Sequence, residues 1–157
     1  ENSDCMVYGD SANNSLSEKE LLCYWNSRER KVPTELMLAK AFIESSYRPF
    51  IFRYEKALPY YYPHIKDSIQ FTDLGMFQVL GMAIPHIKTV HEFPIEYQMD
   101  VFDSMMNACL IKANNNIKVA VHYYNTPALQ YTENYNSNYT FYLYNKIRNG
   151  NKENLFR

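Results

Sequence analysis

The fold is decided by residues 35–49, which read ELMLAKAFIESSYRP. Met37, Ala41 and Glu44 follow helical i, i+4, i+7 spacing, so the carboxylate projects from the same side of the predicted helix as two apolar residues. Pro49 disfavours helical geometry at the residue before it, which places Glu44 in or near the last turn. The negative end of the helix dipole and the apolar neighbours both favour a protonated carboxyl group, the form that a general acid needs. The alternative is an ordinary Glu at the edge of the apolar stripe that points to water.

Length and composition predict one folded domain. The chain has 157 residues, of which 46% are hydrophobic, and this is enough for a core of its own. We therefore expect a single domain over residues 1–157, with an irregular N-terminal arm over residues 1–16. No apolar run reaches the roughly 18 residues that a membrane span needs. The net charge of -1 gives no electrostatic footprint for nucleic acid, so nucleic acid is not an expected partner.

The three cysteines do not form a metal or redox motif. They contain no C-x-x-C and no paired spacing. Cys109 lies on an apolar helical stripe and is expected in the core. Cys5 and Cys23 could pair in an oxidising compartment, which the sequence leaves open. The chain begins at Glu1 without an apolar leader, which is compatible with an exported, processed protein.

Shorter patterns predict the elements on either side of the Glu44 helix. Residues 17–20, Ser-Glu-Lys-Glu, form a capping box that starts a short helix. Residues 50–71 break the helical pattern with two prolines and are expected as an irregular loop, often a lid or a cleft wall. Thr72 and Asp73 look like an N-cap ahead of a helix over residues 74–82.

The second half of the chain predicts further helices. Apolar residues recur every three to four positions over residues 94–113, and a run of Asn follows. Residues 117–124 read as a buried helix. A Tyr-rich helix over residues 134–148 carries Tyr135, Tyr139, Tyr142 and Lys146 on one side. These side chains are expected mainly as core packing, and the alternative is a contact surface for a binding partner. The predicted fold class is therefore mainly α.

The sequence lacks the patterns of most other enzyme classes. Its four His do not fall into a close metal-binding pair, and it contains no G-x-S-x-G, P-loop or G-x-G-x-x-G. Cys109 has no activating neighbour in sequence. We therefore expect no metal and no cofactor, and carboxylate chemistry is the leading enzymatic option.

Three short motifs occur in order along the chain. Residues 41–45, Ala-Phe-Ile-Glu-Ser, look like an E-S motif, residues 75–79, Gly-Met-Phe-Gln-Val, look like G-L-M-Q, and Tyr124-Asn125 looks like the end of A-Y-N. Together they resemble the motifs of the soluble lytic transglycosylases, a family with a goose-type lysozyme-like fold. The gaps of about 30 and 45 residues also match, and the resemblance covers roughly residues 32–128. It implies a lysozyme-like domain with a substrate cleft.

The resemblance implies cleavage of peptidoglycan glycan strands by Glu44. This residue would protonate the leaving oxygen of the β-1,4 bond between N-acetylmuramic acid and N-acetylglucosamine. It would then take the proton from the C6 hydroxyl, which attacks C1 and closes a 1,6-anhydro ring. The implied protein is a monomeric lyase of the periplasm or cell envelope. A secretion or cell-wall assembly complex is left open as a further partner.

The resemblance also assigns residues around the catalytic acid. The substrate-binding residues that it implies are Ser45, Gly75, Met76, Phe77, Gln78, Tyr124 and Asn125. Ser45 would orient Glu44 or the sugar, and Tyr124 would hydrogen-bond to Glu44. For Gln78, Tyr124 and Asn125 the alternative is a polar group that satisfies its own helix end.

Departures from the family pattern put subsite shape in doubt. Met76 and Phe77 stand where the family has Leu and Met, Tyr123 stands for its Ala, and Pro127 stands where a Gly is usual. These changes also put the strand preference in doubt.

Two other functions therefore remain as alternatives. Residues 53–55, Arg-Tyr-Glu, resemble a segment of some phage-type muramidase relatives, which makes Glu55 a cleft candidate; a surface Glu paired with Arg53 is the other interpretation. A hydrolytic muramidase would need a second carboxylate to hold water, and Asp73 and Glu55 are the candidates. A non-catalytic glycan-binding assembly component is the alternative from another class.

Overall fold

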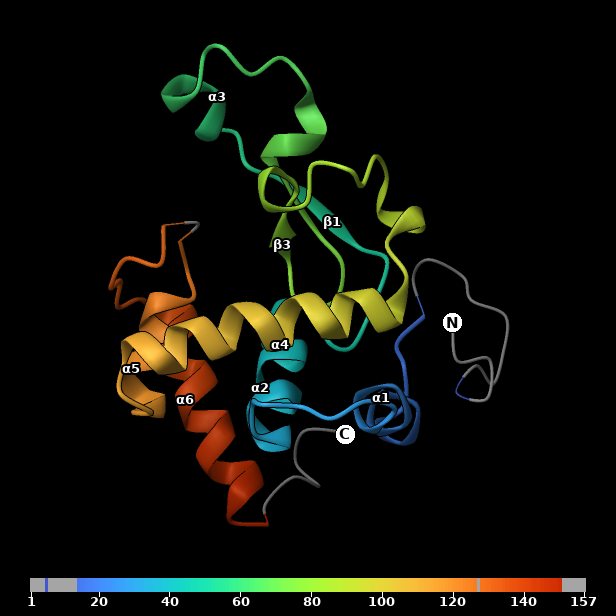
Figure 1. The fold of residues 1–157 in the computed structure, drawn as a ribbon, viewed down its shortest axis with the longest axis vertical. Helices are drawn as coiled ribbons and strands as arrows, with labels where there is room; N and C mark the ends of the chain where they lie inside the picture. Colours follow the sequence, from blue (N-terminus) through green and yellow to red (C-terminus); the bar gives the residue numbers. More distant parts are fainter. Residues whose placement is uncertain (1–4, 6–13, 127, 151–157) are drawn as a thin grey trace. The chain divides into compact units, whose positions relative to one another are not determined.

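The computed structural model describes Cys5, residues 14–126 and residues 128–150, and this part of the chain is mainly helical, as expected (Figure 1). The α-helices are α1 (Glu18–Asn26), α2 (Thr34–Ser45), α3 (Leu58–Tyr61), α4 (Ile95–Lys112), α5 (Ile117–Tyr123) and α6 (Tyr135–Arg148). The strands are β1 (Phe52–Tyr54), β2 (Thr72–Leu74) and β3 (Val79–Leu80), and the 3-10 helices are η2 (Ser68–Phe71), η3 (Gly81–Ala83) and η4 (Val90–Glu92). Among the helices described, none is both long and apolar enough to cross a membrane.

The described residues form two compact units. The first, named the hairpin unit, holds Cys5 and residues 14–27 and 44–99. The second, named the helical unit, holds residues 28–43, 100–126 and 128–150. The prediction of a single domain over residues 1–157 stays a prediction. Pro127 and most of the predicted arm over residues 1–16 lie outside the described residues.

Helix α1 begins where the capping box predicted. The Ser17 side chain accepts a hydrogen bond from the Glu20 N–H at 3.1 Å, and the Glu20 carboxylate accepts one from the Ser17 N–H at 2.9 Å. Two of the N-terminal backbone donors are therefore satisfied by side chains. Cys23 on this helix forms a disulfide with Cys5, so the pairing that the sequence left open is present.

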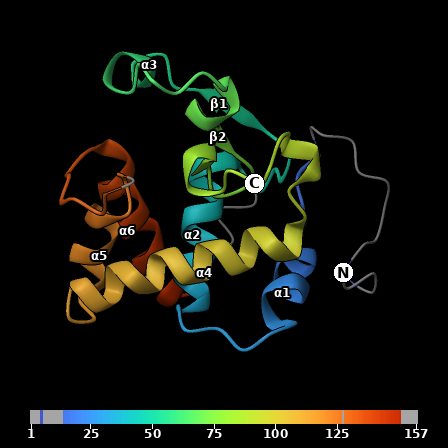
Figure 2. The ribbon, with the colours of Figure 1, turned by 45° about the horizontal axis from the view of Figure 1, so that its top comes forward.

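The sheet of the hairpin unit is antiparallel, in the order β1-β2-β3 (Figure 2). Across β1 and β2, the partners are Phe52 and Leu74, Arg53 and Asp73, and Tyr54 and Thr72. All three side chains of β1 are exposed, whereas Thr72 and Leu74 of β2 are buried. This register brings Arg53 beside Asp73, although 20 residues separate them in the chain.

The helix predicted over residues 74–82 does not form. Gly75 and Gln78 have φ values of +80° and +51°, which no α-helix contains, and they shape a turn between β2 and β3. The N-cap interpretation of Thr72 and Asp73 is therefore wrong, because their backbone pairs with β1 instead of capping a helix. Pairing with a segment this distant is invisible to local helical periodicity.

Residues 50–71 form no long helix, and their elements are the short β1, α3 and η2, with irregular segments between them. Pro59 lies in the first turn of α3, where the missing N–H costs nothing. Tyr60 and Tyr61 on α3 are 85% and 69% exposed. Figure 1 shows α3 at the end of this loop that is distant from the sheet. The loop therefore carries aromatic rings at its surface.

In the helical unit, α4 follows the periodicity predicted over residues 94–113. Phe102, Met106 and Cys109 on its stripe are fully buried, which confirms the core position of the cysteine. Beyond α4, Asn114 and Asn115 adopt φ values of 53° and 64°. Asn tolerates this left-handed region better than most residues, so the Asn run ends the helix as the sequence indicated.

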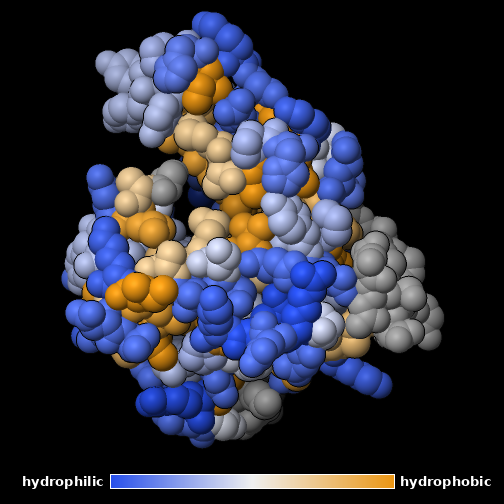
Figure 3. Space-filling model, viewed as in Figure 1, coloured by the Kyte–Doolittle hydropathy of each residue, from blue (hydrophilic) through white to orange (hydrophobic). Residues whose placement is uncertain are grey.

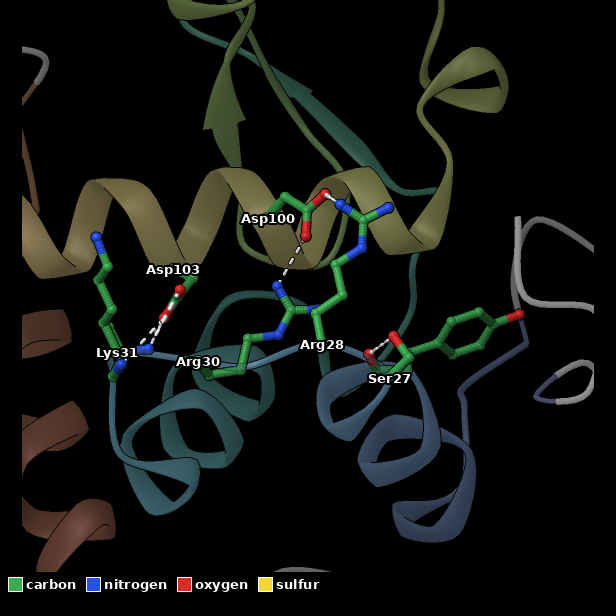
Figure 4. Close-up of polar contacts among 8 residues, drawn as sticks. Ser27, Arg28, Arg30, Lys31, Asp100 and Asp103 are labelled. Atoms are coloured by element: carbon green, nitrogen blue, oxygen red, sulfur yellow. Dashed lines mark hydrogen bonds and ion pairs between the residues drawn. The ribbon is translucent and has the colours of Figure 1, made fainter.

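Charged contacts join the segment before α2 to α4 within the helical unit (Figure 4). The Asp100 carboxylate accepts hydrogen bonds from Arg28 at 2.9 Å and Arg30 at 2.8 Å. The Asp103 carboxylate accepts from the backbone N–H groups of Lys31 at 3.1 Å and Val32 at 3.0 Å. Hydrophilic residues also gather over this face of α4 in the space-filling view (Figure 3).

The tyrosines of α6 lie on one side of the helix, as predicted. Ring centroids are 5.7 Å apart between Tyr135 and Tyr139 and 5.8 Å apart between Tyr139 and Tyr142, and Lys146 Nζ lies 5.1 Å from the Tyr142 centroid. Tyr135 and Tyr142 are 81% and 51% exposed. The expectation that they are core packing is therefore wrong, because other residues of α6 form its buried side.

Candidate active site

Glu44 occupies the last turn of α2, as the sequence predicted, and its side chain is half-buried. The helix ends at Ser45, and the next two residues, Ser46 and Tyr47, have φ values of 53° and 66°. Two consecutive residues other than Gly in the left-handed region cost on the order of 1 kcal/mol each or more. The carboxyl group of Glu44 is therefore held at a helix end that a strained turn follows.

Hydrogen bonds from two directions hold this strained turn. The Ser45 hydroxyl accepts a hydrogen bond from the Arg48 N–H at 3.2 Å, and the Ser45 carbonyl accepts one from Arg48 Nε at 2.9 Å. From the segment before α1, the Ser15 hydroxyl donates to the Ser46 carbonyl at 2.8 Å, and the Leu16 N–H donates to the Tyr47 carbonyl at 2.8 Å. Ser45 is buried and serves to cap the helix end that carries Glu44.

Arg53, Glu55 and Asp73 form a charged cluster on the β1–β2 hairpin. Arg53 Nη2 lies 2.8 Å from Glu55 Oε2 and 3.5 Å from Asp73 Oδ2. The side chains are 73%, 34% and 13% exposed, respectively, so Asp73 is the buried member. Glu55 follows the end of β1 and is two residues from Arg53, so strand alternation places both side chains on the same face.

The two carboxyl groups of this cluster hold one proton between them at neutral pH. Burial, together with the hydrogen bond and negative charge of Glu55, raises the pKa of Asp73 to about 8. The hydrogen bond from Asp73, supported by Arg53, lowers the pKa of Glu55 despite its own partial burial. Asp73 is therefore the proton-bearing group and Glu55 the ionised one.

Glu44 is close enough to this cluster to influence it. Its electrostatic interaction with Asp73 is the smallest of the contributions that change the pKa of that residue, and it raises this pKa. The hairpin unit thus combines a half-buried carboxyl group at a helix end with an ionised carboxylate on a hairpin. Two carboxyl groups are what glycosidic bond cleavage commonly uses.

The Gly75–Gln78 turn begins directly after β2, two residues beyond Asp73. The Gly75 N–H donates to the Ile51 carbonyl at 2.9 Å, and the Gly75 carbonyl accepts from the Gln78 N–H at 3.1 Å and from its Nε2 at 2.9 Å. Met76 and Phe77 are fully buried, so their side chains belong to the core and cannot line an open cleft. Gly75 is buried as well and both of its backbone groups are already hydrogen-bonded, so the half-buried Gln78 is the residue of the turn that a ligand could reach.

Tyr124 and Asn125 belong to the helical unit, whereas the other predicted site residues belong to the hairpin unit. Tyr124 is 7% exposed, and Lys40 Nζ lies 4.9 Å from the centroid of its ring. The Asn125 side chain donates to the Thr132 carbonyl at 3.3 Å. The predicted hydrogen bond between Tyr124 and Glu44 joins residues of different units and stays a prediction.

Two fully buried polar residues, Gln98 and Lys40, were not predicted from the sequence. Gln98 makes three side-chain hydrogen bonds in the hairpin unit, and Lys40 donates from Nζ to Asn136 Oδ1 at 2.8 Å in the helical unit. A signal for both was present, because each lies at a core-facing position of an apolar stripe: Lys40 follows Met37 by three residues, and Gln98 precedes Phe102 by four. A polar residue at such a position has to find a buried partner.

Comparisons of the chain with known proteins identify no relative. A scan against protein-family models, a search of curated proteins and a search of solved structures found no match to the chain.

Proposed function

We propose that the chain is a lytic transglycosylase with a lysozyme-like fold, which cleaves the β-1,4 bond between N-acetylmuramic acid and N-acetylglucosamine in peptidoglycan. The observation that carries the proposal is the position of Glu44. Its half-buried carboxyl group ends α2 in the same unit as the Gly75–Gln78 turn, and it is close enough to Asp73 to affect the pKa of that residue. The order of the three sequence motifs supports the same assignment.

In the proposed reaction, Glu44 donates its proton to the glycosidic oxygen as the bond from that oxygen to C1 breaks. The muramic C6 hydroxyl then attacks C1 through its oxygen and gives its proton to the Glu44 carboxylate. A 1,6-anhydro ring forms, water is not consumed, and Glu44 returns to its starting state. One carboxyl group suffices because the nucleophile belongs to the substrate.

Hydrolysis on the same fold is the second candidate, and the hairpin cluster favours it. Glu55 is ionised, 34% exposed and oriented by Arg53, as a base that holds an attacking water requires. Asp73, with a pKa of about 8, keeps its proton near neutral pH and donates a hydrogen bond to Glu55. In this candidate Glu44 remains the acid and the product carries a reducing end.

Mass analysis of digested peptidoglycan tests the proposal. The parent protein is expected to release fragments with anhydro ends, which are lighter by one water than hydrolytic products, and Glu44→Gln is expected to release none. If the parent releases fragments with reducing ends, the hydrolytic candidate replaces the proposed lytic transglycosylase. No fragments from a folded parent that still sediments with peptidoglycan would point to a glycan-binding component.

The setting that we propose is the cell envelope, with the chain acting as a monomer on glycan strands. The Cys5–Cys23 disulfide supports export, because disulfides persist mainly in oxidising compartments. Retention of this disulfide in protein purified from the envelope, measured by alkylation before and after reduction, tests the localisation.

A further inference from the structure

Gln98 is a fully buried amide at the start of α4, and all of its hydrogen-bonding partners lie within the hairpin unit. Its Oε1 accepts a hydrogen bond from the Met76 N–H at 2.7 Å. Its Nε2 donates to the Pro49 carbonyl at 2.7 Å and to the Phe93 carbonyl at 3.0 Å. These contacts use both amide hydrogens and the amide oxygen, so only one orientation of the side chain satisfies them.

The two distant partners flank the proposed active site. Pro49 lies two residues beyond the strained turn after Glu44, and Met76 follows Gly75 in the turn between β2 and β3. In sequence these partners lie 49 and 22 residues from Gln98. One side chain therefore fixes the Gly75–Gln78 turn relative to the segment that follows the proposed acid.

Gly75 shows how tightly this contact is built. A Cβ added at Gly75 would lie 2.5 Å from Oε1 of Gln98, closer than Cβ atoms approach other atoms. The φ of +80° at this position also favours Gly. The absent side chain at Gly75 thus makes room for the Gln98 amide.

We propose that Gln98 is a positioning residue, which holds the Gly75–Gln78 turn in register with the end of α2 so that Glu44 meets the glycan in a reactive geometry. The proposal rests on the proposed function. Small displacements of reacting groups reduce turnover more than they reduce binding. The effect of losing Gln98 should therefore appear in kcat and leave KM nearly unchanged.

The test compares kcat and KM of the parent, Gln98→Met and Gln98→Glu on soluble glycan strands from peptidoglycan. Gln98→Met keeps the side-chain length and removes the hydrogen bonds, and we expect kcat to fall at least about tenfold with KM within about threefold. In Gln98→Glu the protonated carboxyl group can accept a hydrogen bond from the Met76 N–H and donate one to the Pro49 carbonyl. The ionised group repels the carbonyl oxygens of Pro49 and Phe93. The kcat of Gln98→Glu relative to the parent should therefore recover from pH 8 toward pH 5.

Leu21→Ala is the matched control, because Leu21 is a fully buried α1 residue of the same unit with no side-chain hydrogen bond. It should lower the melting temperature and leave kcat at 25 °C within about twofold of the parent value. If Gln98→Met does not fold, the proposal is tested by whether the kcat of Gln98→Glu, relative to the parent, recovers from pH 8 toward pH 5.

Three outcomes contradict the proposal in distinguishable ways. An active parent with unchanged kcat in Gln98→Met overturns the role of Gln98 alone. If Leu21→Ala and Gln98→Met lose kcat equally and Gln98→Glu shows no pH-dependent recovery of kcat, Gln98 contributes only to the stability of the fold. A folded parent that does not cleave glycan overturns the proposed function as well.

Discussion

Arg53 and Asp73 face each other across β1 and β2, with Arg53 Nη2 3.5 Å from Asp73 Oδ2. The same nitrogen lies 2.8 Å from Glu55 Oε2, so a single guanidinium serves two carboxyl groups. With one proton on Asp73, the cluster of Arg53, Glu55 and Asp73 is neutral overall, as its partial burial favours. Loss of that proton leaves two adjacent carboxylates and one cation, and this has consequences for stability and for activity.

Asp73→Asn should make the folded protein less sensitive to rising pH. Asp73 keeps its proton in the folded state up to about pH 8, whereas the unfolded chain loses it near pH 4. Its contribution to stability is therefore complete below about pH 4 and falls as the pH rises from 4 to 8. Between pH 6 and pH 8 the parent should lose about 2 kcal/mol of unfolding free energy more than Asp73→Asn, as measured by urea denaturation. Parallel pH dependences in the two proteins would contradict the assignment of the proton to Asp73.

Glu55→Gln separates the two candidate reactions. A lytic transglycosylase uses the substrate hydroxyl as nucleophile, so we expect turnover within about tenfold of the parent value. A hydrolase that needs Glu55 to activate water should lose at least about 100-fold. The fold should persist, because the partly exposed Arg53–Glu55 pair contributes at most about 1 kcal/mol.

Asp67→Asn is the control for loss of a surface charge, since Asp67 pairs with Lys88 at 4.0 Å on the same unit. Its turnover should equal that of the parent. A large loss of turnover in Glu55→Gln together with an unchanged Asp67→Asn would rule against the lyase.

Removal of the Cys5–Cys23 disulfide should destabilise the protein and weaken the site. The bond spans 18 residues of sequence, and the closed loop contains Ser15 and Leu16, which hold the strained turn after Glu44. The double replacement by Ser should cost about 3 kcal/mol of unfolding free energy, measured by urea denaturation. Turnover should fall at a lower temperature than in the parent.

Cys109 is an internal control for that experiment. It is fully buried, and burial raises the pKa of its thiol to about 11. In the native parent, iodoacetamide at pH 8 should therefore not modify Cys109, whereas it should do so in urea. Rapid alkylation of Cys109 in the Ser variant under native conditions would show that the disulfide supports the whole fold rather than the turn alone.

The elements that were predicted correctly from the sequence are helices whose stabilising contacts join residues close together in the chain. The periodicity over residues 94–113 and the capping box at Ser17 each depend on neighbours within a few residues, and α4 and α1 formed there. The end of α2 just after Glu44 was predictable for the same reason, because a proline follows closely. Local steric and capping rules suffice for such features.

The features that were missed depend on contacts between distant segments. Residues 74–82 carry apolar residues that suit a helix, but the positive φ values of Gly75 and Gln78 and the pairing of residues 72–74 with β1 decide the outcome. The proton on Asp73 depends on burial and on Glu55, which is 18 positions earlier in the chain. The three partners of Gln98 likewise come together only after folding.

The most direct test of the account is the mass of the muropeptides that the parent and Glu44→Gln release from purified peptidoglycan. We expect anhydro-muramic ends from the parent and no release from Glu44→Gln, although the variant should fold and sediment with the glycan as the parent does. Release of the same products by Glu44→Gln at a rate within about tenfold of the parent would contradict the assignment of Glu44 as the acid.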